Sequence, residues 1–398
     1  MKTFKLLFIA ATCCTILSCD KEFLEAKPDK ALLVPTTAKE IQALLDNNGV
    51  IINLTPALPE ISSDDFYITD AGYGALFTEL ERTTYIWSDQ KQQVATVTDW
   101  ETPYKQVFYA NVALKAAEKL QPGKTSEAEI NALKGSALFI RAYAHFNLLQ
   151  AFAAPYEKST AGNLPGVPVR LSSNVNDRPG RGTVQQAYDQ VINDITAAEK
   201  LLPVQTAYKT RPSKTAANAL LARVYLAMEN YDKAGEYAAA SLELNNKLID
   251  YNSLNPAAPR PLPPSLPNGN DEVIYFSRNT VFSYFTSAAT TVEPALHNSY
   301  AANDLRKAVF FNNRGNGVIN FRGGYNGNGD VFSGLATDEM YLIRSESFAR
   351  QGKAPDALKD LNTLLEKRWK TGTFVPFTAA NAEEALKLIL AERRKELL

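Results

Sequence analysis

The chain has 398 residues, of which 45% are apolar, and a formal net charge of −1 at pH 7. A charge this close to zero argues against nucleic acid as a partner and against a polybasic membrane patch. The chain has only two histidines, His145 and His297, which lie far apart in the sequence, and only three cysteines. A zinc site of ordinary type is therefore not expected. No cofactor and no metal ligand are predicted, and whether the loops bind a metal ion stays open.

The first predicted element is a short hydrophobic leader that ends at Cys19. Lys2 and Lys5 precede an apolar run from Leu6 to Leu17, which is too short to span a bilayer, since a spanning helix needs about 20 residues. Small or aliphatic residues just before the cysteine are typical of bacterial lipoprotein signals. We therefore expect residues 1–18 to be a signal peptide and Cys19 to carry the lipid that holds the protein on a membrane. The alternative is a plain signal peptide with an incidental cysteine.

The mature chain would keep a single cysteine, because Cys13 and Cys14 lie inside the leader. With that cysteine lipidated no internal disulfide can form, so the fold must be stabilised by a packed core. The polar, acidic stretch 19–30 is expected to be a tether. The remainder, 31–398, is expected to form one domain.

Helical periodicity dominates the next part of the chain. Apolar residues recur at the spacing of one helix face in 106–120 and again in 135–150. Thr183 is a good N-cap for a third helix, which Pro203 should end.

Two later segments, 213–244 and 336–368, each read as a pair of helices joined by a short turn. In each segment the first helix carries a small residue and an aromatic residue three positions later. The second helix carries an alanine or a leucine at matching positions. This spacing is similar to that of tetratricopeptide units. About a hundred residues of other character separate them, so a regular solenoid is not expected. The helical scaffold is predicted over about 100–250 and 336–398.

Two irregular regions, about 47–90 and 252–334, interrupt the helical pattern. Pro256–Pro267 contains six prolines, which forbids a helix and favours extended chain. Val273–Phe276 is predicted to be a short strand. Asn312–Gly334 is rich in glycine and asparagine, and a long loop of this kind in a helical protein is usually functional or disordered.

Taken together, these segments resemble the SusD/RagB family of outer-membrane nutrient-binding lipoproteins. The likeness covers nearly the whole chain and rests on six stretches in order: the leader with the following DKEFLE, Trp100–Lys115, Gly135–Tyr156, Arg211–Ala227, Asp338–Arg350 and Ile389–Leu397. Ala153-Ala154 stands where the family usually has Gly-Asp. Family members also continue past the position of Leu398, so the resemblance implies a truncated chain; a natural end is the alternative.

The resemblance implies a mostly α-helical fold, in which tetratricopeptide-like hairpins support a loop-rich binding face. It implies a non-catalytic lipoprotein that is anchored in the outer membrane, exposed at the cell surface, and covers a SusC-type TonB-dependent transporter. Such proteins capture glycans, or peptides in some members, for import. Two other functions stay open: a surface-anchored glycosidase, and a tetratricopeptide-type scaffold for protein partners.

Glycan capture needs exposed, rigid aromatic rings that stack on sugars and polar groups that bond to hydroxyls. The irregular regions supply such residues, although ordinary packing under a loop is the alternative for each aromatic. The predicted binding residues are Asp64, Asp65, Tyr73, Arg82, Tyr85, Trp87, Tyr300, Phe321, Arg322 and Tyr325. Other aromatics lie in or beside apolar helix patterns and are expected in the core: Trp100, Tyr104, Tyr143, Tyr225 and Trp369.

No catalytic constellation is apparent. His145 lacks a nucleophile partner and is expected to be structural. Asp64 and Asp65 are adjacent, and neighbouring residues of an extended chain point to opposite sides, so a turn role is expected rather than a pair of glycosidase carboxyls. The glycines of 323–329 lie in no strand-to-helix context, which excludes a phosphate-binding loop.

Overall fold

The computed structural model describes residues 35–88, 97–266 and 269–398. The predicted signal peptide, the tether and Cys19 lie outside this part. Residues 36–398 form one compact unit. Within the described residues, the helices are too short or too polar to cross a membrane.

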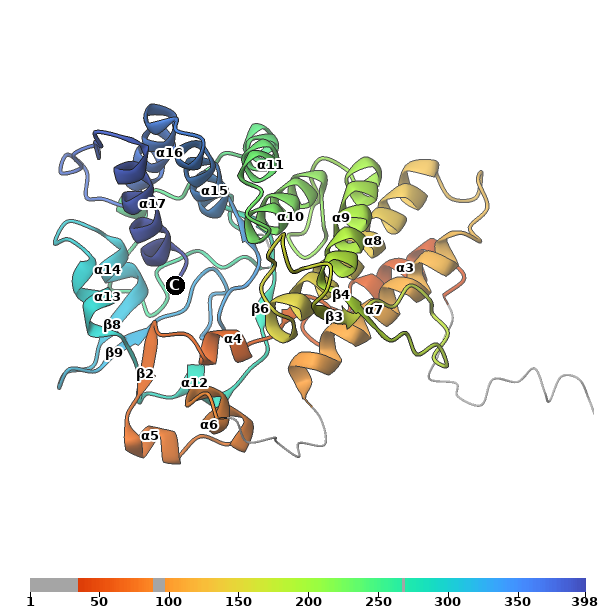
Figure 1. The fold of residues 1–398 in the computed structure, drawn as a ribbon, viewed down its shortest axis with the longest axis horizontal. Coiled ribbons are helices and arrows are strands. Elements are labelled where there is room, and N and C mark those ends of the chain that lie inside the picture. The colour runs from red at the N-terminus through yellow and green to blue at the C-terminus, as the bar shows by residue number, and fades with distance from the viewer. Residues whose placement is uncertain (1–34, 89–96, 267–268) are drawn as a thin grey trace, which may run out of the picture. The chain divides into compact units, whose positions relative to one another are not determined.

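Most of the helices form a row in which each packs against the next (Figure 1). In chain order these are α7 (Thr98–Ala117), α8 (Glu127–Phe152), α9 (Val184–Leu201), α10 (Lys214–Ala227), α11 (Tyr231–Leu244), α15 (Thr337–Arg350), α16 (Ala354–Glu366) and α17 (Ala382–Glu396). α15 contacts both α16 and α17, while α3 (Ala38–Leu45) packs on α7 and α8 at the other end. The mostly α-helical fold predicted from the sequence is confirmed.

The local start and stop signals place these helices correctly. Thr183 caps α9, and its hydroxyl accepts from the backbone N–H of Gln186 while the Gln186 side chain bonds back to the cap. Such a reciprocal cap satisfies two N–H groups that would otherwise lack partners. α9 ends before Pro203, as predicted. α7 begins at Thr98, earlier than the predicted start at residue 106.

Both predicted helical hairpins are present. The turn between α10 and α11 has Glu229 at φ 56°, and the turn between α15 and α16 has Gly352 at φ 79°. The matching small residues Ala222 and Ser345 are fully buried, and the Ser345 hydroxyl donates to the carbonyl of Ala357 at 2.7 Å. Small side chains here let the two helices of each hairpin approach closely.

The two hairpins also pack directly on one another, which the sequence did not predict. α11 contacts α15, and a Cβ built on Gly235 of α11 would lie 2.9 Å from the Cβ of Ser347 on α15. The residues between α11 and α15 leave the helical row after α11 and return to it at α15. The separation of the hairpins in sequence therefore does not separate them in space.

In the part of the chain that the structure describes, short strands form five two-stranded sheets. β1 (Leu54–Thr55) pairs in parallel with β6 (Arg278–Asn279). The antiparallel pairs are β2 (Phe66–Ile68) with β7 (Thr290–Val292), β3 (Pro165–Pro168) with β4 (Arg181–Thr183), β5 (Val273–Tyr275) with β10 (Leu335–Ala336), and β8 (Phe311–Asn313) with β9 (Ile319–Phe321). The predicted strand at 273–276 is thus confirmed as β5.

The two irregular regions carry more regular structure than expected. Region 47–90 contains α4 (Leu58–Ile61), α5 (Asp70–Gly74) and α6 (Glu79–Tyr85). Region 252–334 contains the β8–β9 hairpin, where a single long loop was expected, and three short helices, α12 (Ser283–Thr286), α13 (Pro294–Ser299) and α14 (Arg306–Phe310), after a 3-10 turn η1 (Tyr251–Ser253). The proline-rich segment is neither helix nor strand as far as residue 266.

Candidate functional site

The two irregular regions are joined into one face by contacts between residues far apart in sequence. The β1–β6 and β2–β7 pairs connect them directly. The buried Asn53 amide donates to the carbonyl of Phe276 at 2.7 Å. The buried carboxylate of Asp99 accepts from the backbone N–H groups of Ala57 and Leu58, at 2.6 and 2.7 Å. This carboxylate fixes the start of α4 against α7.

A cavity of about 660 Å³ lies between this face and the helical row. α4 contributes Pro59 and Glu60 to its wall, and the end of α17 and the last residues of the chain form another side. The wall mixes aromatic and hydrogen-bonding groups, as a sugar site requires. Among them are Phe146, Asn147, Gln150, Arg223, Asn279, Phe321, Tyr325, Phe332 and Glu339.

An ion pair holds one side of the cavity. Arg223 of α10 contacts Glu339 of α15 through two bonds, at 2.7 and 2.6 Å. Burial alone would lower the pKa of Arg223, but the carboxylate of Glu339 raises it above its ordinary value. Arg223 also donates to the carbonyl of Ser333 at 3.3 Å. The pair is therefore fixed in place, and it presents to the cavity charged groups that already have hydrogen-bond partners.

Trp87 is the most exposed of the predicted aromatic binding residues, with 75% of its surface open. Its backbone has φ 54°, an uncommon conformation for a bulky residue. Its indole N–H donates to the carbonyl of Ser62 at 3.0 Å. Ser62 ends α4, the helix whose Pro59 and Glu60 line the cavity. Trp87 does not itself line the cavity; it is an exposed ring that is hydrogen-bonded to the residue that ends this helix.

Asp64 and Asp65 also lie beside this helix, and both approach the same cation. Arg394 of α17 donates from Nε to Asp65 at 2.8 Å and lies 3.6 Å from Asp64. The expectation that their side chains diverge is wrong, because the chain bends here before β2 starts at Phe66. The Asp64 side chain is 94% exposed. The expected turn role fits this geometry.

Tyr73, Arg82 and Tyr85 belong to the packing of α5 and α6 instead. The Tyr85 hydroxyl accepts from the backbone N–H of Ile68 at 3.2 Å, and its ring lies 6.1 Å from that of Tyr73. Arg82 donates to Glu79 at 2.9 Å and to the carbonyl of Leu76. None of the three lines the cavity.

Residues from the second irregular region divide into two groups. Phe321 and Tyr325 line the cavity. Tyr300 is only 2% exposed and its hydroxyl donates to the carbonyl of Lys395 at 2.7 Å. Arg322 donates to the carbonyls of Phe311, Pro256 and Ala258, and so ties the proline-rich segment to β8. Tyr300 and Arg322 were expected to face a ligand, and these contacts make them structural.

The expected core aromatics are found in or against the core. Tyr143 is 3% exposed and donates to the carbonyl of Ser333 at 2.7 Å. Tyr225 stacks on Tyr237 with ring centres 5.5 Å apart. The remaining three, Trp100, Tyr104 and Trp369, are half-buried against the same cluster. His145 is buried, and its Nε2 accepts from the backbone N–H of Arg170 at 3.3 Å, which fits the expected structural role.

Several cavity residues were missed by the sequence analysis. Phe146, Asn147 and Gln150 lie on α8, which is buried on most of its surface, so its apolar stripe does not reveal which side faces a cavity. Arg223 and Glu339 sit on helices of different hairpins. The match between the hairpins gives no signal for this pair, because aligning Ala222 with Ser345 places Arg223 opposite Glu346.

Comparison with known proteins gives a consistent result. The model of the SusD-like family, described as starch-binding and associating with the outer membrane, matches residues 22–226. SusD-like protein P2 of Formosa agariphila is 28% identical over 149 residues, 37% of this chain and 27% of that protein. A SusD-like protein of Bacteroides ovatus is 28% identical over 147 residues, 36% and 25% of the two chains. The chain thus matches about a quarter of the length of each relative.

Solved structures share the fold over nearly all of the chain. A SusD superfamily protein from Bacteroides vulgatus superposes with a TM-score of 0.72 at 22% identity, covering 91% of this chain and 86% of the other. A SusD-like carbohydrate-binding protein from the same species gives a TM-score of 0.69 at 18% identity, with 91% and 81% covered.

Proposed function

The chain belongs to the SusD-like family, and from that membership we propose that it binds a carbohydrate at the outer membrane and delivers it to a SusC-type TonB-dependent transporter. The family description, starch-binding and associating with the outer membrane, supports the first half of this proposal. Delivery to a transporter follows from the resemblance. A lipid on Cys19 and exposure at the cell surface complete the proposal.

The observation that carries carbohydrate binding is that the exposed Trp87 is hydrogen-bonded to Ser62, at the end of the helix whose Pro59 and Glu60 line the cavity. Its ring is open to solvent and its orientation is fixed by the bond to Ser62. The adjoining cavity offers the aromatic rings of Phe321 and Tyr325 together with the amides of Asn147 and Gln150. A sugar stacked on the indole could extend further units toward these groups.

The function requires no catalysis. Of the predicted acidic residues, Asp65 is engaged by Arg394, and Asp64 lies beside the same guanidinium. These contacts hold the pair in a structural role rather than across a sugar from one another. A glycosidase remains the competing function, and turnover of a bound oligosaccharide is its signature.

The test is a calorimetric titration of the mature protein with starch oligosaccharides and a panel of other glycans and peptides. Trp87→Ala is expected to weaken the best ligand by about 1–3 kcal/mol, by analogy with base stacking on aromatic rings. Phe77→Ala is the matched control, because Phe77 is 87% exposed but its backbone N–H bonds to Ser283 and not to α4. Equal binding by wild type and Trp87→Ala would remove Trp87 from the site. Product formation would favour the glycosidase, and binding to peptides alone would redirect the proposal to a peptide ligand.

The membrane anchor is tested separately. Cys19→Ser is expected to leave ligand affinity unchanged and to release the protein from the outer-membrane fraction. Retention of the variant in that fraction would mean that contact with a membrane protein is the dominant anchor.

A further inference from the structure

A groove of about 530 Å³ lies between α7 and the loop 169–180 that joins β3 to β4, and it shares no lining residue with the cavity described above. Three aromatic side chains of α7, Trp100, Tyr104 and Phe108, line it. They recur at every fourth residue, so they lie on one face of the helix at successive turns, over about 12 Å. The floor of the groove is therefore an elongated row of rings.

The row is held rigidly on its inner side and remains open on its outer side. Trp100 and Tyr104 pack against the main hydrophobic cluster, with their ring centres 5.0 Å apart. Trp100 also meets the ring of Phe152 edge-on at 5.1 Å. Phe108 belongs to no hydrophobic cluster within the described residues. All three α7 rings are only half-buried, so each keeps a surface that a ligand can contact.

Hydrogen bonds fix the opposite wall of the groove. The Tyr104 hydroxyl donates to the carbonyl of Pro168 at 2.9 Å. The buried Asn111 amide donates to the carbonyls of Arg170 and Ser172 at 3.1 and 3.2 Å. A peptide that adds to a sheet edge needs free backbone groups of this kind, and these carbonyls already accept bonds from side chains. A ligand of the groove must therefore be recognised by side chains.

Three arginines surround the row of rings. Arg170 and Arg178 line the groove, and the guanidinium of Arg181 lies 6.0 Å from the centre of the Trp100 ring. Burial raises the pKa of Tyr104, and the charges of Arg181 and Arg170 oppose the rise, so both cations act on the floor. Within the described residues, none of the three arginines forms an ion pair with a carboxylate.

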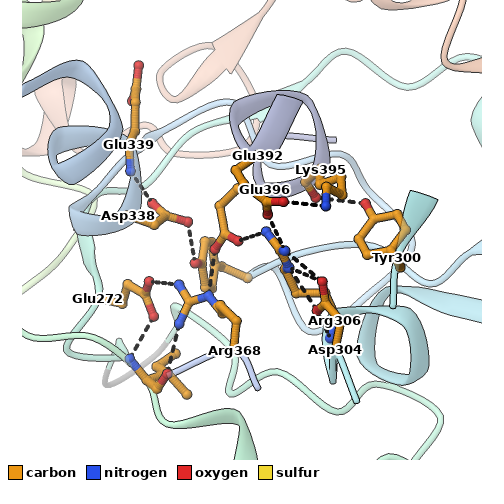
Figure 2. A network of polar contacts seen from close by, with 12 residues as sticks. Glu272, Tyr300, Asp304, Arg306, Asp338, Glu339, Arg368, Glu392, Lys395 and Glu396 are labelled. Atoms are coloured by element: carbon orange, nitrogen blue, oxygen red, sulfur yellow. Dashed lines mark hydrogen bonds and ion pairs between the residues drawn. The ribbon is translucent and has the colours of Figure 1, made fainter. Parts of the chain in front are cut away.

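The acidic groups of the groove do not balance these charges. Glu101 bonds to Lys105 at 3.4 Å, and Asp177 accepts a side-chain hydrogen bond within its own loop. The buried Arg306 and Arg368 show the opposite arrangement, because several carboxylates bind each of them (Figure 2). The three arginines and Lys105 thus outnumber the two carboxylates, and the groove attracts negative charge.

The ligand that fits this groove has flat apolar faces and carries negative groups along its length. A guanidinium binds a carboxylate through two parallel hydrogen bonds, and rigid aromatic rings stack on the apolar faces of sugars. A chain of uronic acid sugars offers both features. We propose that the groove binds an acidic oligosaccharide, whose sugar rings stack on the α7 aromatics and whose carboxylates pair with the three arginines. This second site goes beyond the proposed function and depends neither on Trp87 nor on the cavity.

The test is a calorimetric titration of the mature protein with oligogalacturonate. Binding should weaken as salt is added, because salt screens exposed charges. Arg178→Gln should weaken binding about tenfold, as expected for the loss of a hydrogen bond to a charged group. Arg314→Gln is the matched control and should bind like wild type. Arg314 is also exposed, lies outside the groove and bonds to the neutral side chain of Asn320.

A variant of the floor gives an independent measurement. Phe108→Ala removes one ring and should weaken oligogalacturonate binding about tenfold, by analogy with base stacking on aromatic rings. Tyr109→Ala is the matched control, because Tyr109 is the next residue of α7, is also half-buried and does not line the groove. It should bind like wild type.

Trp87→Ala separates this site from the cavity. It should leave the affinity for oligogalacturonate unchanged, and a loss of affinity would place the acidic sugar at Trp87 and overturn the second site. No binding by wild type, or equal binding by wild type, Arg178→Gln and Phe108→Ala, would also overturn it. Maltohexaose is the neutral probe and polyglutamate the peptide probe. Binding of either with the affinity of oligogalacturonate would contradict an acidic sugar as the ligand.

Discussion

Arg394 of α17 donates from Nε to the carboxylate of Asp65 at 2.8 Å, joining two residues 329 positions apart. The contact connects the last helix to the loop that leads into β2, next to the bend that carries Asp64. Both partners are partly exposed, 46% for Arg394 and 26% for Asp65. It is a direct link between α17 and the N-terminal irregular region.

Arg394→Ala is expected to lower the free energy of unfolding by no more than about 1 kcal/mol, because partly exposed ion pairs contribute little in water. The loss should shrink at high salt, which screens such pairs. Urea denaturation at low and high salt measures both. Lys387→Ala, which breaks an exposed pair with Glu383 inside α17, is the control and should have a smaller effect. A loss well above 2 kcal/mol would mean that Arg394 does more than pair with Asp65.

Gly235→Ala should destabilise the protein at the junction of the two hairpins. The new methyl group would lie 2.9 Å from the Cβ of Ser347, which is fully buried and cannot swing away. Overpacking of this kind costs about 1–3 kcal/mol, against a gain of up to about 1 kcal/mol in helix propensity. A net loss should be measurable by thermal denaturation.

Gly74→Ala provides the control for this change. Gly74 also lies in a helix, at the end of α5, but a Cβ there meets no atom within 4 Å. The substitution should be neutral or stabilising. If Gly235→Ala were equally well tolerated, α11 and α15 would have to separate more easily than their close approach indicates.

His145 should make stability depend on pH in the acidic range. Burial, and to a smaller extent the charge of Arg141, lower the pKa of His145 from an ordinary value of 6.5 to about 3. The unfolded chain therefore binds a proton between pH 6.5 and 3 that the folded chain does not. The free energy of unfolding should fall as pH decreases through this window, by at most about 1.4 kcal/mol for each pH unit.

His145→Gln is expected to flatten this dependence, because the amide oxygen can still accept from Arg170 and does not titrate. His297→Gln is the control, since His297 is only half-buried. Urea midpoints between pH 4 and 7 give the comparison. If the pH dependence of stability seen in wild type persists in His145→Gln, it arises from other titrating groups.

Local signals in the sequence predicted the scaffold well. Thr183 and Pro203 mark the bounds of α9, and the small residues of the two hairpins lie where close packing requires them. These features depend on residues a few positions apart. Contacts between residues far apart in the sequence, such as that between Gly235 and Ser347, were not predicted.

The binding residues were harder to predict for the same reason. Exposed and buried aromatics look alike in a loop sequence, and their difference is set by long-range contacts. Tyr300 is buried because its hydroxyl reaches the carbonyl of Lys395, 95 residues later. Trp87 remains exposed because its backbone turns at a positive φ and its indole bonds to Ser62.

The direct packing of α11 on α15 has a consequence for the order of folding. Helices α7 to α11 meet neighbours that are close in sequence, so this half of the row can assemble from local contacts, which form quickly. Packing α15 against α11 requires closing the long loop between these two helices. The entropic cost of closing a loop rises with the logarithm of its length. The β5–β10 pair, which ends next to α15, closes part of this loop and so shortens the segment that remains to be closed before the hairpins meet. We therefore expect the first half of the row to form early and the second hairpin to dock late, after β5 and β10 have paired.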